Sequence, residues 1–299
     1  MKFNKIVCVD NTKLTRAAIN ELQKYSEDGV DNYRDYPEEE AEVIKRIGNA
    51  EAVLVSWKTQ LNESVIKQCP NLKYIGMSCS LYDDESANVA VNFARERGIR
   101  VKGIFDYGDP GVVEFIASEL VRLLHGLGEH QWQEMPVELT KRKIGIIGLG
   151  TTGQMLAECL LPFGAHLYYF SRTRKKKWEE KGVKYLPLDE FLEKSEIISF
   201  HLPRNTKLLN SREFEILGQG KIIISTSLGL PFEEKAFQKW LKNEGNFGIF
   251  DGDAREALSE ATLAEKSLIS SEKSAGWSKE TRQRLSDKVL KNIREFIDN

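Results

Sequence analysis

The sequence predicts an α/β fold with two domains, each built on a doubly wound parallel sheet. Short apolar runs alternate with amphipathic helical segments from the first residues onward, as in parallel βαβ units. The alternation begins a second time at residue 143, after a long apolar helical segment. A chain of 299 residues is also too long for one small core. Together these observations favour two α/β domains over one.

The first series of elements occupies the N-terminal third of the chain. Each predicted strand is a short apolar run, and each predicted helix carries apolar residues at helical spacing. Strands are expected at residues 5–10, 51–57, 73–79 and 99–105, and helices at residues 15–25, 63–69 and 91–98.

The second series starts at residue 143 and has helices between its strands. The strands are expected at residues 143–150, 166–170, 196–203, 221–226 and 247–252. Residues 278–299 close the chain with one more amphipathic helix.

The helix expected at the join of the two series, residues 109–126, is strongly apolar. Asp109 suits an N-cap and Pro110 suits a first helical turn. Apolar residues then recur at helical spacing over a broad face, at Val112, Val113, Ile116, Leu120, Val121, Leu123 and Leu124. Periodicity leaves two interpretations open, burial in the core and a contact between two copies of the chain. A homodimer is the expected assembly.

Charge and composition exclude several classes of partner. The chain has 43 basic and 45 acidic residues, so there is no electrostatic reason to expect a nucleic acid or a membrane surface. It has no apolar stretch near the ~18 residues of a membrane span, and the start MKFNKIVCVD lacks a signal-type apolar region. Four scattered cysteines without a CxxC motif favour a reducing compartment. The expected location is the cytoplasm. No two of the four histidines have metal-ligand spacing, so no metal is expected.

The motif GLGTTG predicts a dinucleotide site. Gly148, Gly150 and Gly153 have GxGxxG spacing directly after a predicted strand and at the start of a predicted helix. The first glycine suits the tight turn, the second the approach of the backbone to a pyrophosphate, and the third close helix packing. Backbone amides at the helix start, around Thr151 and Thr152, would hold the phosphate charge. A glycine turn without a ligand is the alternative, and the strand–turn–helix context argues against it.

The end of the next predicted strand indicates which dinucleotide is bound. An NAD site places Asp or Glu there, about 20 residues on, to bind the ribose hydroxyls. This chain has Ser171 instead, followed by Arg172 and Arg174. A hydroxyl with neighbouring guanidinium groups can bind a 2′-phosphate, so the sequence favours NADPH over NADH. A solvated basic turn is the alternative for SRTRKKK.

The order of motifs along nearly the whole chain resembles the D-isomer-specific 2-hydroxyacid dehydrogenases. The resemblance is carried by NLKYIGMSC, ARERGIRV, GVVEFIASELVRLL, KIGIIGLGTTGQ, EIISFHLP, FGIFDGDAREAL and SEKSAGWSKETRQRL. It implies a discontinuous flavodoxin-like substrate domain, residues 1–104 with 277–299, and a Rossmann NAD(P)-binding domain, residues 105–276. It also implies hydride transfer between a nicotinamide and a small-molecule carbonyl or hydroxyl carbon. By the same resemblance His201 and Thr226 border the cofactor, and Asp251 is an anchor on the nicotinamide side.

The catalytic residues of that family match only in part. In the family an Arg grips the substrate carboxylate, a His moves the proton and a Glu supports the His. Here the Arg position is Leu228, the Glu is retained as Glu256, and the His position is Lys273. A leucine cannot make the charged hydrogen bonds, roughly 1.5–3 kcal/mol each, that hold a carboxylate. We therefore expect altered substrate recognition, with Lys273 handling the proton and Glu256 setting its charge. The alternative is an ion pair without a catalytic role.

The loop SCSLYDDESANV also departs from the family, because it has no glycine where the family has a glycine-rich turn. Ser78, Cys79 and Tyr82 are candidates for substrate contacts, together with Leu228, and an ordinary surface loop is the alternative.

Three functions remain open from the sequence. The first is an NADP(H)-dependent oxidoreductase that acts on a carbonyl, or an imine, with altered substrate recognition. The second is a nucleotide-binding sensor that has lost catalysis. The third is an ordinary 2-hydroxyacid dehydrogenase whose carboxylate grip comes from another residue, such as Arg255.

Overall fold

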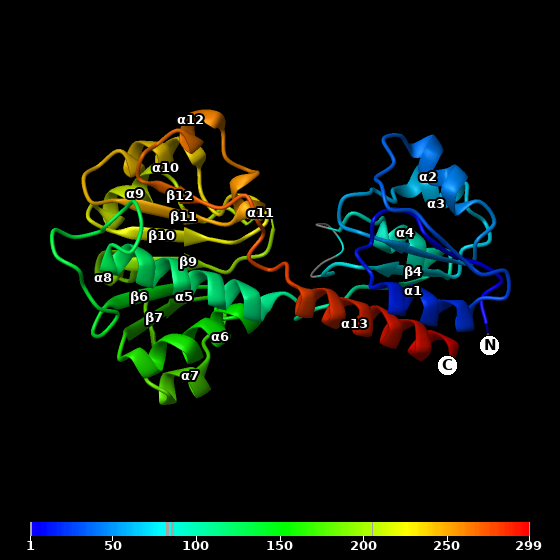
Figure 1. Ribbon diagram of the computed structural model, residues 1–299, viewed down its shortest axis with the longest axis horizontal. Helices are drawn as coiled ribbons and strands as arrows, with labels where there is room; N and C mark the ends of the chain where they lie inside the picture. Colours follow the sequence, from blue (N-terminus) through cyan, green and yellow to red (C-terminus); the bar gives the residue numbers. More distant parts are fainter. Residues whose placement is uncertain (1, 82–83, 85–86, 205, 299) are drawn as a thin grey trace. The chain divides into compact units, whose positions relative to one another are not determined.

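The computed structural model describes residues 2–81, 84, 87–204 and 206–298. The chain divides into two compact units, Met1–Tyr107 with Ser278–Asn299, and Gly108–Trp277 (Figure 1). Each unit has a parallel sheet covered by helices, so the predicted α/β fold with two doubly wound sheets is confirmed. The first of these is unit 1 and the second is unit 2.

Unit 1 is built on a five-stranded parallel sheet with the order β2-β1-β3-β4-β5. This is the flavodoxin-like order, and its direction reverses between β1 and β3. The elements of unit 1 are β1 (Ile6–Cys8), α1 (Arg16–Leu22), η1 (Gln23–Tyr25), β2 (Val30–Asn32), α2 (Glu40–Ile47), β3 (Ala52–Val55), α3 (Glu63–Lys67), β4 (Tyr74–Met77), α4 (Val91–Glu96), β5 (Arg100–Lys102) and α13 (Lys279–Ile297).

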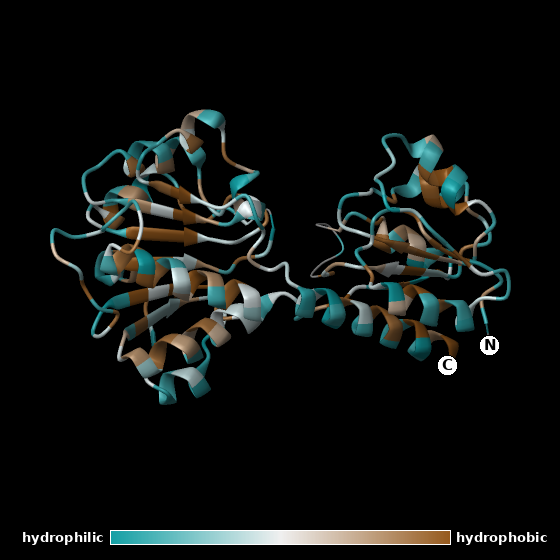
Figure 2. Cartoon of the chain, viewed as in Figure 1, coloured by the Kyte–Doolittle hydropathy of each residue, from teal (hydrophilic) through white to brown (hydrophobic). Residues whose placement is uncertain are grey.

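The last helix of the chain belongs to the core of unit 1. Its apolar residues Leu285, Val289 and Ile293 are buried against the same face of the sheet as α1. The helix begins after Ser278, whose hydroxyl accepts a hydrogen bond from the backbone N–H of Thr281 at 3.0 Å. In both units the strands are mostly apolar, whereas the outer faces of the helices are mostly polar (Figure 2).

Unit 2 is built on a seven-stranded parallel sheet with the order β12-β11-β10-β9-β6-β7-β8. The order reverses at β6 and β9, as in a Rossmann sheet. The elements of unit 2 are α5 (Asp109–His125), β6 (Lys143–Ile147), α6 (Thr151–Leu160), η2 (Leu161–Phe163), β7 (His166–Phe170), α7 (Lys176–Glu180), β8 (Lys184–Tyr185), α8 (Leu188–Lys194), β9 (Ile197–Phe200), α9 (Ser211–Leu217), β10 (Ile222–Ser225), α10 (Glu234–Leu241), β11 (Phe247–Phe250), α11 (Gly252–Arg255), α12 (Glu260–Leu263) and β12 (Leu268–Ser270).

Both faces of this sheet are covered, which explains its continuous apolar strands. In β10, Ile222 and Ile224 pack with α5 and α6, whereas Ile223 packs with α8, α9 and α10 on the opposite face.

The apolar stripe of α5 faces the core of unit 2, so burial in the core is the interpretation that holds for its buried residues. Its N-cap is Gly108, one residue before the predicted Asp109. Among the helices in the described ranges, none is long and apolar enough to cross a membrane.

Candidate functional site

The residues predicted for the cofactor follow neighbouring strands of unit 2 at one edge of its sheet. The loops after β11, β10, β9, β6 and β7 carry Asp251, Thr226, His201, Gly148 and Ser171, in that order along the edge. Because all these strands are parallel, their carboxyl ends meet at this edge. Ligands of open α/β sheets bind there, where the strand order reverses. The reversal lies between the loops of Gly148 and His201.

Two glycines of the motif are required by the protein itself. Gly148 has φ +91°, and a Cβ built there would lie 2.2 Å from the carbonyl oxygen of His201. At Gly153 a Cβ would lie 2.2 Å from the carbonyl oxygen of Gly148. Any side chain at either position would force the β6 loop, the β9 loop and α6 apart.

Gly150 is different, because nothing in the protein requires a glycine there. Its φ is −83°, and a Cβ would meet no atom within 4 Å. It is the N-cap of α6, where no side chain caps the helix. The first backbone N–H groups of a helix have no partner within the helix, and they attract negative charge. The open space beside Gly150 therefore borders a helix start that suits a phosphate.

Thr152 is already engaged in unit 2. Its hydroxyl donates a short hydrogen bond to a carboxylate oxygen of Asp109, the first residue of α5. Thr151 precedes it at the exposed first position of α6. The two threonines therefore differ, since only Thr152 connects the helix starts of α5 and α6.

His201 forms part of the same edge as a neutral imidazole. Burial lowers the pKa of His201 to about 4, because a charged ring would lose its hydration. Its Nε2 atom lies 2.9 Å from the hydroxyl of Ser199, and its backbone N–H donates to the carbonyl of Ile147 at 2.8 Å. These contacts fix the loop whose backbone passes Gly148.

The turn after β7, residues 171–175, is held by side chains on both sides. Arg174 is paired with Glu179, and its guanidinium lies 5.1 Å from the ring centroid of Tyr185. The Ser171 hydroxyl donates to the backbone carbonyl of Thr173 at 2.6 Å. Arg172 is exposed and has no ion pair among the described residues. The two predicted guanidinium groups are therefore in unequal surroundings.

Asp251 is almost fully buried and uses both carboxylate oxygens on backbone groups. One accepts from Ala254 N–H at 3.0 Å and caps α11, and the other accepts from Ala275 N–H at 2.8 Å. Burial raises the pKa of Asp251 to about 6, against the effect of these donors. Gly252 follows, and a Cβ there would lie 2.7 Å from the backbone of Glu272 and Lys273. The Asp251 carboxylate and the close approach at Gly252 together hold residues 272–275 against the end of β11.

Glu256 and Lys273, the predicted catalytic pair, lie near this same junction. The backbone carbonyl of Lys273 accepts from Gly252 N–H at 2.9 Å, and Glu256 ends the short helix α11. Both side chains are exposed, and within the described residues neither makes an ion pair or a side-chain hydrogen bond. The ion pair that does form at this junction joins Arg255 and Glu272, at 3.5 Å. Arg255 is thus already engaged by a carboxylate of its own unit.

Leu228 lies in the bend that follows β10. It is partly buried, and the next residue, Gly229, has φ +83°. The Ser227 hydroxyl donates to the carbonyl of Phe200 at 3.4 Å, which ties this bend to the end of β9. Thr226, between the strand and the bend, is also partly buried.

The substrate candidates of unit 1 are largely core residues. Ser78 and Cys79 follow β4 with 4% and 6% of their surfaces exposed, and Cys79 lies in the apolar core. This burial favours a structural role for both side chains. Tyr82 lies outside the described residues.

A buried carboxylate that was not among the predicted site residues, Asp10, lies at the point where the strand order of unit 1 reverses. Asp10, directly after β1, accepts hydrogen bonds from the backbone and hydroxyl of Ser56 at 2.9 and 2.6 Å. It is fully buried, and burial raises its pKa. Its place at the carboxyl end of an apolar strand was the signal available in the sequence.

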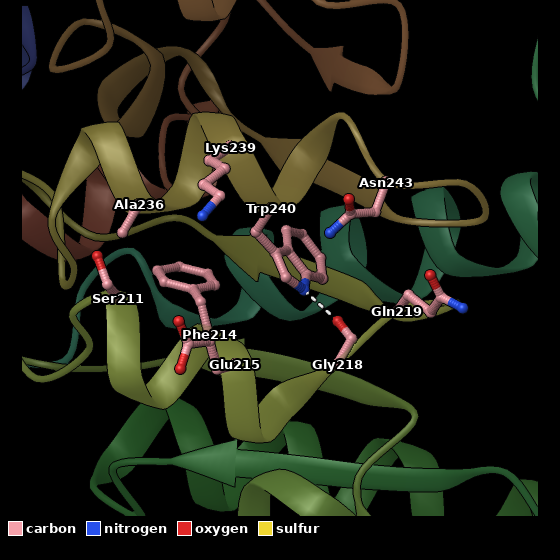
Figure 3. Close-up of a pocket in the computed structure, with 9 residues that line it drawn as sticks. All are labelled: Ser211, Phe214, Glu215, Gly218, Gln219, Ala236, Lys239, Trp240 and Asn243. Atoms are coloured by element: carbon pink, nitrogen blue, oxygen red, sulfur yellow. Dashed lines mark hydrogen bonds between the residues drawn. The ribbon is translucent and has the colours of Figure 1, made fainter.

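A hollow on unit 2 lies at the other end of the strands, away from the residues predicted for the cofactor. It lies between α9 and α10 and has a volume of about 250 Å³ (Figure 3). Phe214 and Trp240 line it, and the indole N–H of Trp240 donates to the carbonyl of Gly218 at 2.6 Å. Gly218 precedes β10, so this hollow borders the amino ends of the strands and is separate from the glycine motif. No group of three acidic, His or Cys side chains in the described ranges could hold a metal ion.

Comparison with known proteins places these features in a family. Residues 116–268, about half of the chain, match the model of the NAD binding domain of D-isomer specific 2-hydroxyacid dehydrogenases. A hydroxypyruvate reductase of Blautia hydrogenotrophica is 28% identical over 279 residues, covering 86% of this chain and 85% of that protein. A glyoxylate reductase of Korarchaeum cryptofilum is 24% identical over 280 residues, covering 85% and 82%.

The fold is also similar to that of solved structures. The acyclic imino acid reductase Bsp5, solved in complex with NADPH and D-Arg, superposes with a TM-score of 0.82 at 24% identity. The match covers 98% of this chain and 97% of that one. The strand order, the glycine turn and the matched domain agree with each other. The chain belongs to the D-isomer-specific 2-hydroxyacid dehydrogenase family.

Proposed function

We propose that the protein is an NADPH-dependent reductase that acts on a small molecule with a C=O or C=N bond. The observation that carries the proposal is the open space at Gly150. The protein needs no glycine there, yet the position borders the uncapped start of α6. A pyrophosphate that approaches this backbone accounts for the glycine, and the helix start supplies its N–H donors.

The remaining residues of the edge fit the rest of a dinucleotide. Ser171 and Arg172 follow β7, where the adenosine ribose is bound in Rossmann sheets, and neither is a carboxylate. A bound 2′-phosphate would meet a hydroxyl and a cation there, so NADPH is preferred over NADH. His201, held neutral by burial, adds no competing charge at the centre of the edge.

When bound, the nicotinamide supplies or accepts the hydride. The chain's own residues must then bind the substrate and move a proton. Lys273 donates a proton or polarises the reacting double bond, and Glu256 tunes the charge of Lys273. Leu228 removes the guanidinium that would bind a 2-oxo acid carboxylate in the family's usual way. The Arg255–Glu272 pair makes Arg255 a poor replacement. A substrate that is less acidic, or that has its own cation, is therefore favoured.

Two groups of similar proteins suggest substrates for a screen. The relatives include a hydroxypyruvate reductase and a glyoxylate reductase, whose names are those of 2-oxo acid reductases. The structural neighbour Bsp5 is an imino acid reductase, solved with the basic amino acid D-Arg. An imine carries a nitrogen that a neighbouring carboxylate, such as Glu256, can stabilise in its protonated form. Imines formed from 2-oxo acids and amines therefore belong in the screen beside the 2-oxo acids.

The test is oxidation of NADPH by the purified full chain in the presence of a panel of 2-oxo acids, aldehydes, quinones and imines. We expect turnover of at least one carbonyl or imine, with a lower KM for NADPH than for NADH. Tight NADPH binding without turnover of any member would contradict the reductase. A failure to bind either nucleotide in a calorimetric titration would contradict the proposal at its first step.

A nucleotide sensor is the second candidate, and one observation favours it. Lys273 and Glu256 are both exposed, and in the described residues no ion pair or hydrogen bond joins their side chains. An acid–base pair that works through a hydrogen bond would lie closer, although such contacts often tighten only with substrate. The screen separates the two candidates, because the sensor binds NADPH and turns over nothing.

We also propose that the protein is a homodimer that uses unit 2. Three large apolar residues are strongly exposed there, Leu127 at 64%, Met135 at 72% and Phe163 at 49%. They follow α5 or α6, two helices that pack on each other. A second copy would remove this surface from water. Light scattering of the wild type and of Met135→Lys tests the proposal. We expect a dimer that the substitution weakens, and a monomeric wild type would overturn it.

A further inference from the structure

We propose that the hollow between α9 and α10 is a second small-molecule site, and that it takes an amino acid with an aromatic side chain. The hollow borders the amino ends of the strands of unit 2, so it is separate from the proposed dinucleotide site and does not depend on the proposed function. Its volume of about 250 Å³ is below the roughly 300–1,000 Å³ of pockets for drug-sized ligands. A molecule the size of one amino acid is therefore favoured over a nucleotide.

The apolar side of the hollow consists of two aromatic rings that are held in place. Phe214 and Trp240 have 5% and 3% of their surfaces exposed, and their ring centroids lie 5.8 Å apart. Phe214 also packs edge-on against Phe232. The indole N–H of Trp240 donates to the carbonyl of Gly218, which fixes the orientation of the indole. The rings therefore form an apolar surface that an aromatic group can contact without first ordering it.

Two side chains of opposite charge border the Phe214 end of the hollow (Figure 3). Lys239 comes from α10 and Glu215 from α9, and both are exposed. Within the described ranges neither makes an ion pair or a side-chain hydrogen bond, so the two charges do not neutralise each other. A ligand with an ammonium group for Glu215 and a carboxylate for Lys239 would pair with both. An α-amino acid has these two groups on one carbon atom.

The Trp240 end of the hollow is uncharged. Gln219 and Asn243 lie there, and both have amide side chains (Figure 3). Lys239 and Glu215 are the only charged residues among the described residues that line the hollow. An amino acid held by those two charges would extend its side chain from Phe214 toward Trp240. An aromatic side chain can pack on the indole there, whereas a charged side chain would find no partner.

The test titrates the purified full chain with phenylalanine, as each enantiomer in turn. NMR follows the indole N–H resonance of Trp240, which is assigned with Trp240→Phe. Phenethylamine lacks the carboxylate and 3-phenylpropionate lacks the ammonium group, so each compound reports on one of the two charges. Lys239→Gln and Glu215→Gln remove the partners of those charges. Lys235→Gln is the matched control, because Lys235 is also an exposed lysine of α10 but does not line the hollow. Thermal unfolding checks that each variant folds.

We expect phenylalanine to shift the Trp240 resonance with a Kd on the order of a millimolar, as for a small ligand between exposed charges. Phenethylamine and 3-phenylpropionate should each bind about three- to tenfold more weakly, because each loses one charged hydrogen bond. Lys239→Gln should weaken phenylalanine binding by a similar factor and remove its advantage over phenethylamine. Glu215→Gln should remove its advantage over 3-phenylpropionate. Lys235→Gln should keep the Kd within about twofold of the wild type.

Two results would overturn the inference. One is a Trp240 resonance that neither enantiomer shifts at concentrations on the order of 10 mM. The other is phenylalanine binding that Lys239→Gln and Glu215→Gln leave unchanged, because the amino acid would then bind at another place, such as the proposed catalytic edge. A failure of the proposed function is distinguishable from both. A chain that binds no dinucleotide, but in which phenylalanine binds at Lys239 and Glu215, keeps this inference and loses the reductase.

Discussion

The carboxylate of Asp251 accepts a hydrogen bond from the backbone N–H of Ala275 at 2.8 Å, across 24 residues of sequence. The contact joins the end of β11 to the segment that carries Lys273. The other carboxylate oxygen caps α11, the helix that ends at Glu256. One buried side chain thus positions both predicted catalytic residues. The family resemblance implied a nicotinamide anchor at Asp251, and the hydrogen bonds give it this positioning role in unit 2.

The first prediction concerns the effect of Asp251 on stability. Its pKa is raised from 3.8 to about 6, so the protonated form is the one that folding favours. The stabilisation is complete below pH 3.8 and is lost as the pH rises through 6. A shift of this size corresponds to about 3 kcal/mol. We therefore expect the free energy of unfolding of the wild type, relative to Asp251→Asn, to fall by about this amount between pH 4 and 7.

Urea unfolding of both proteins across this pH range measures the difference. Asp253→Asn is a useful comparison, because it removes a minor cause of the raised pKa of Asp251 and leaves that carboxyl able to titrate, so the pH dependence should persist in a slightly smaller form. A difference between wild type and Asp251→Asn that does not depend on pH would contradict the raised pKa.

The second prediction separates two glycines of one motif. Gly148→Ala should destabilise the protein by roughly 2–4 kcal/mol, because φ is positive and the new Cβ would clash with the carbonyl of His201. Gly150→Ala should lower the unfolding midpoint much less, because its Cβ meets nothing within 4 Å and only the preference of an N-cap for glycine over alanine is lost. It should nevertheless weaken NADPH binding at least tenfold, since the methyl group occupies the space of the pyrophosphate. Thermal unfolding and calorimetry decide both. Tight NADPH binding by Gly150→Ala would remove the main support for the proposed site.

The fold was predictable from the sequence because its central strands are buried on both faces. Runs such as KIVCVD, KIGIIG and KIIIST correspond to the central strands β1, β6 and β10. Of the edge strands, β5 (Arg100–Lys102) was predicted, within residues 99–105, whereas β2, β8 and β12 were missed. β2 (Val30–Asn32) and β8 (Lys184–Tyr185) are short and partly polar, and β12 (Leu268–Ser270) is three residues long. An edge strand has a neighbour on one side only, so it needs no long apolar run.

The candidate site was predictable only where spacing alone defines the geometry. The glycine motif has such spacing, and the structure gives Gly148 and Gly153 close backbone contacts. The unequal surroundings of Arg172 and Arg174 depend on Glu179 and Tyr169, which reach the turn through side-chain geometry. The burial of Ser78 and Cys79 depends on tertiary packing. Neither the surroundings of the two arginines nor the burial of Ser78 and Cys79 produces a periodic pattern in the sequence.

The third prediction concerns the charge of His201. Burial lowers its pKa to about 4, below its ordinary value of 6.5, so the neutral form is favoured by folding. The stability from this residue is present above pH 6.5 and is lost as the pH falls through 4, opposite in direction to Asp251. Relative to His201→Gln, the wild type should lose on the order of 2–3 kcal/mol over that interval. NMR titration of the imidazole, assigned with the same variant, tests the cause directly. A midpoint near 6.5 would contradict it.

The fourth prediction concerns Lys273, whose exposed side chain stands where the family has a histidine. If it handles the proton, Lys273→Ala should lower kcat on the substrate found in the screen by about a hundredfold or more, as for loss of a general acid. The Kd of NADPH should not change, because the residues proposed to bind it, at the carboxyl ends of the strands, stay in place. Lys266→Ala is the matched control, since Lys266 is also an exposed lysine of unit 2, in the turn before β12.

Glu256→Gln completes this test. It distinguishes a role of Glu256 that acts through Lys273 from a role in supporting the fold. If Glu256 acts through Lys273, Glu256→Gln should lower kcat in the wild type and add little in the Lys273→Ala background. A purely structural role would also lower the unfolding midpoint, and its effect on kcat would add to that of Lys273→Ala. If Lys273→Ala keeps kcat within about threefold of the wild type, proton transfer comes from another group or from water. In that case Lys273 is not the group that moves the proton, although it stands at the family's histidine position.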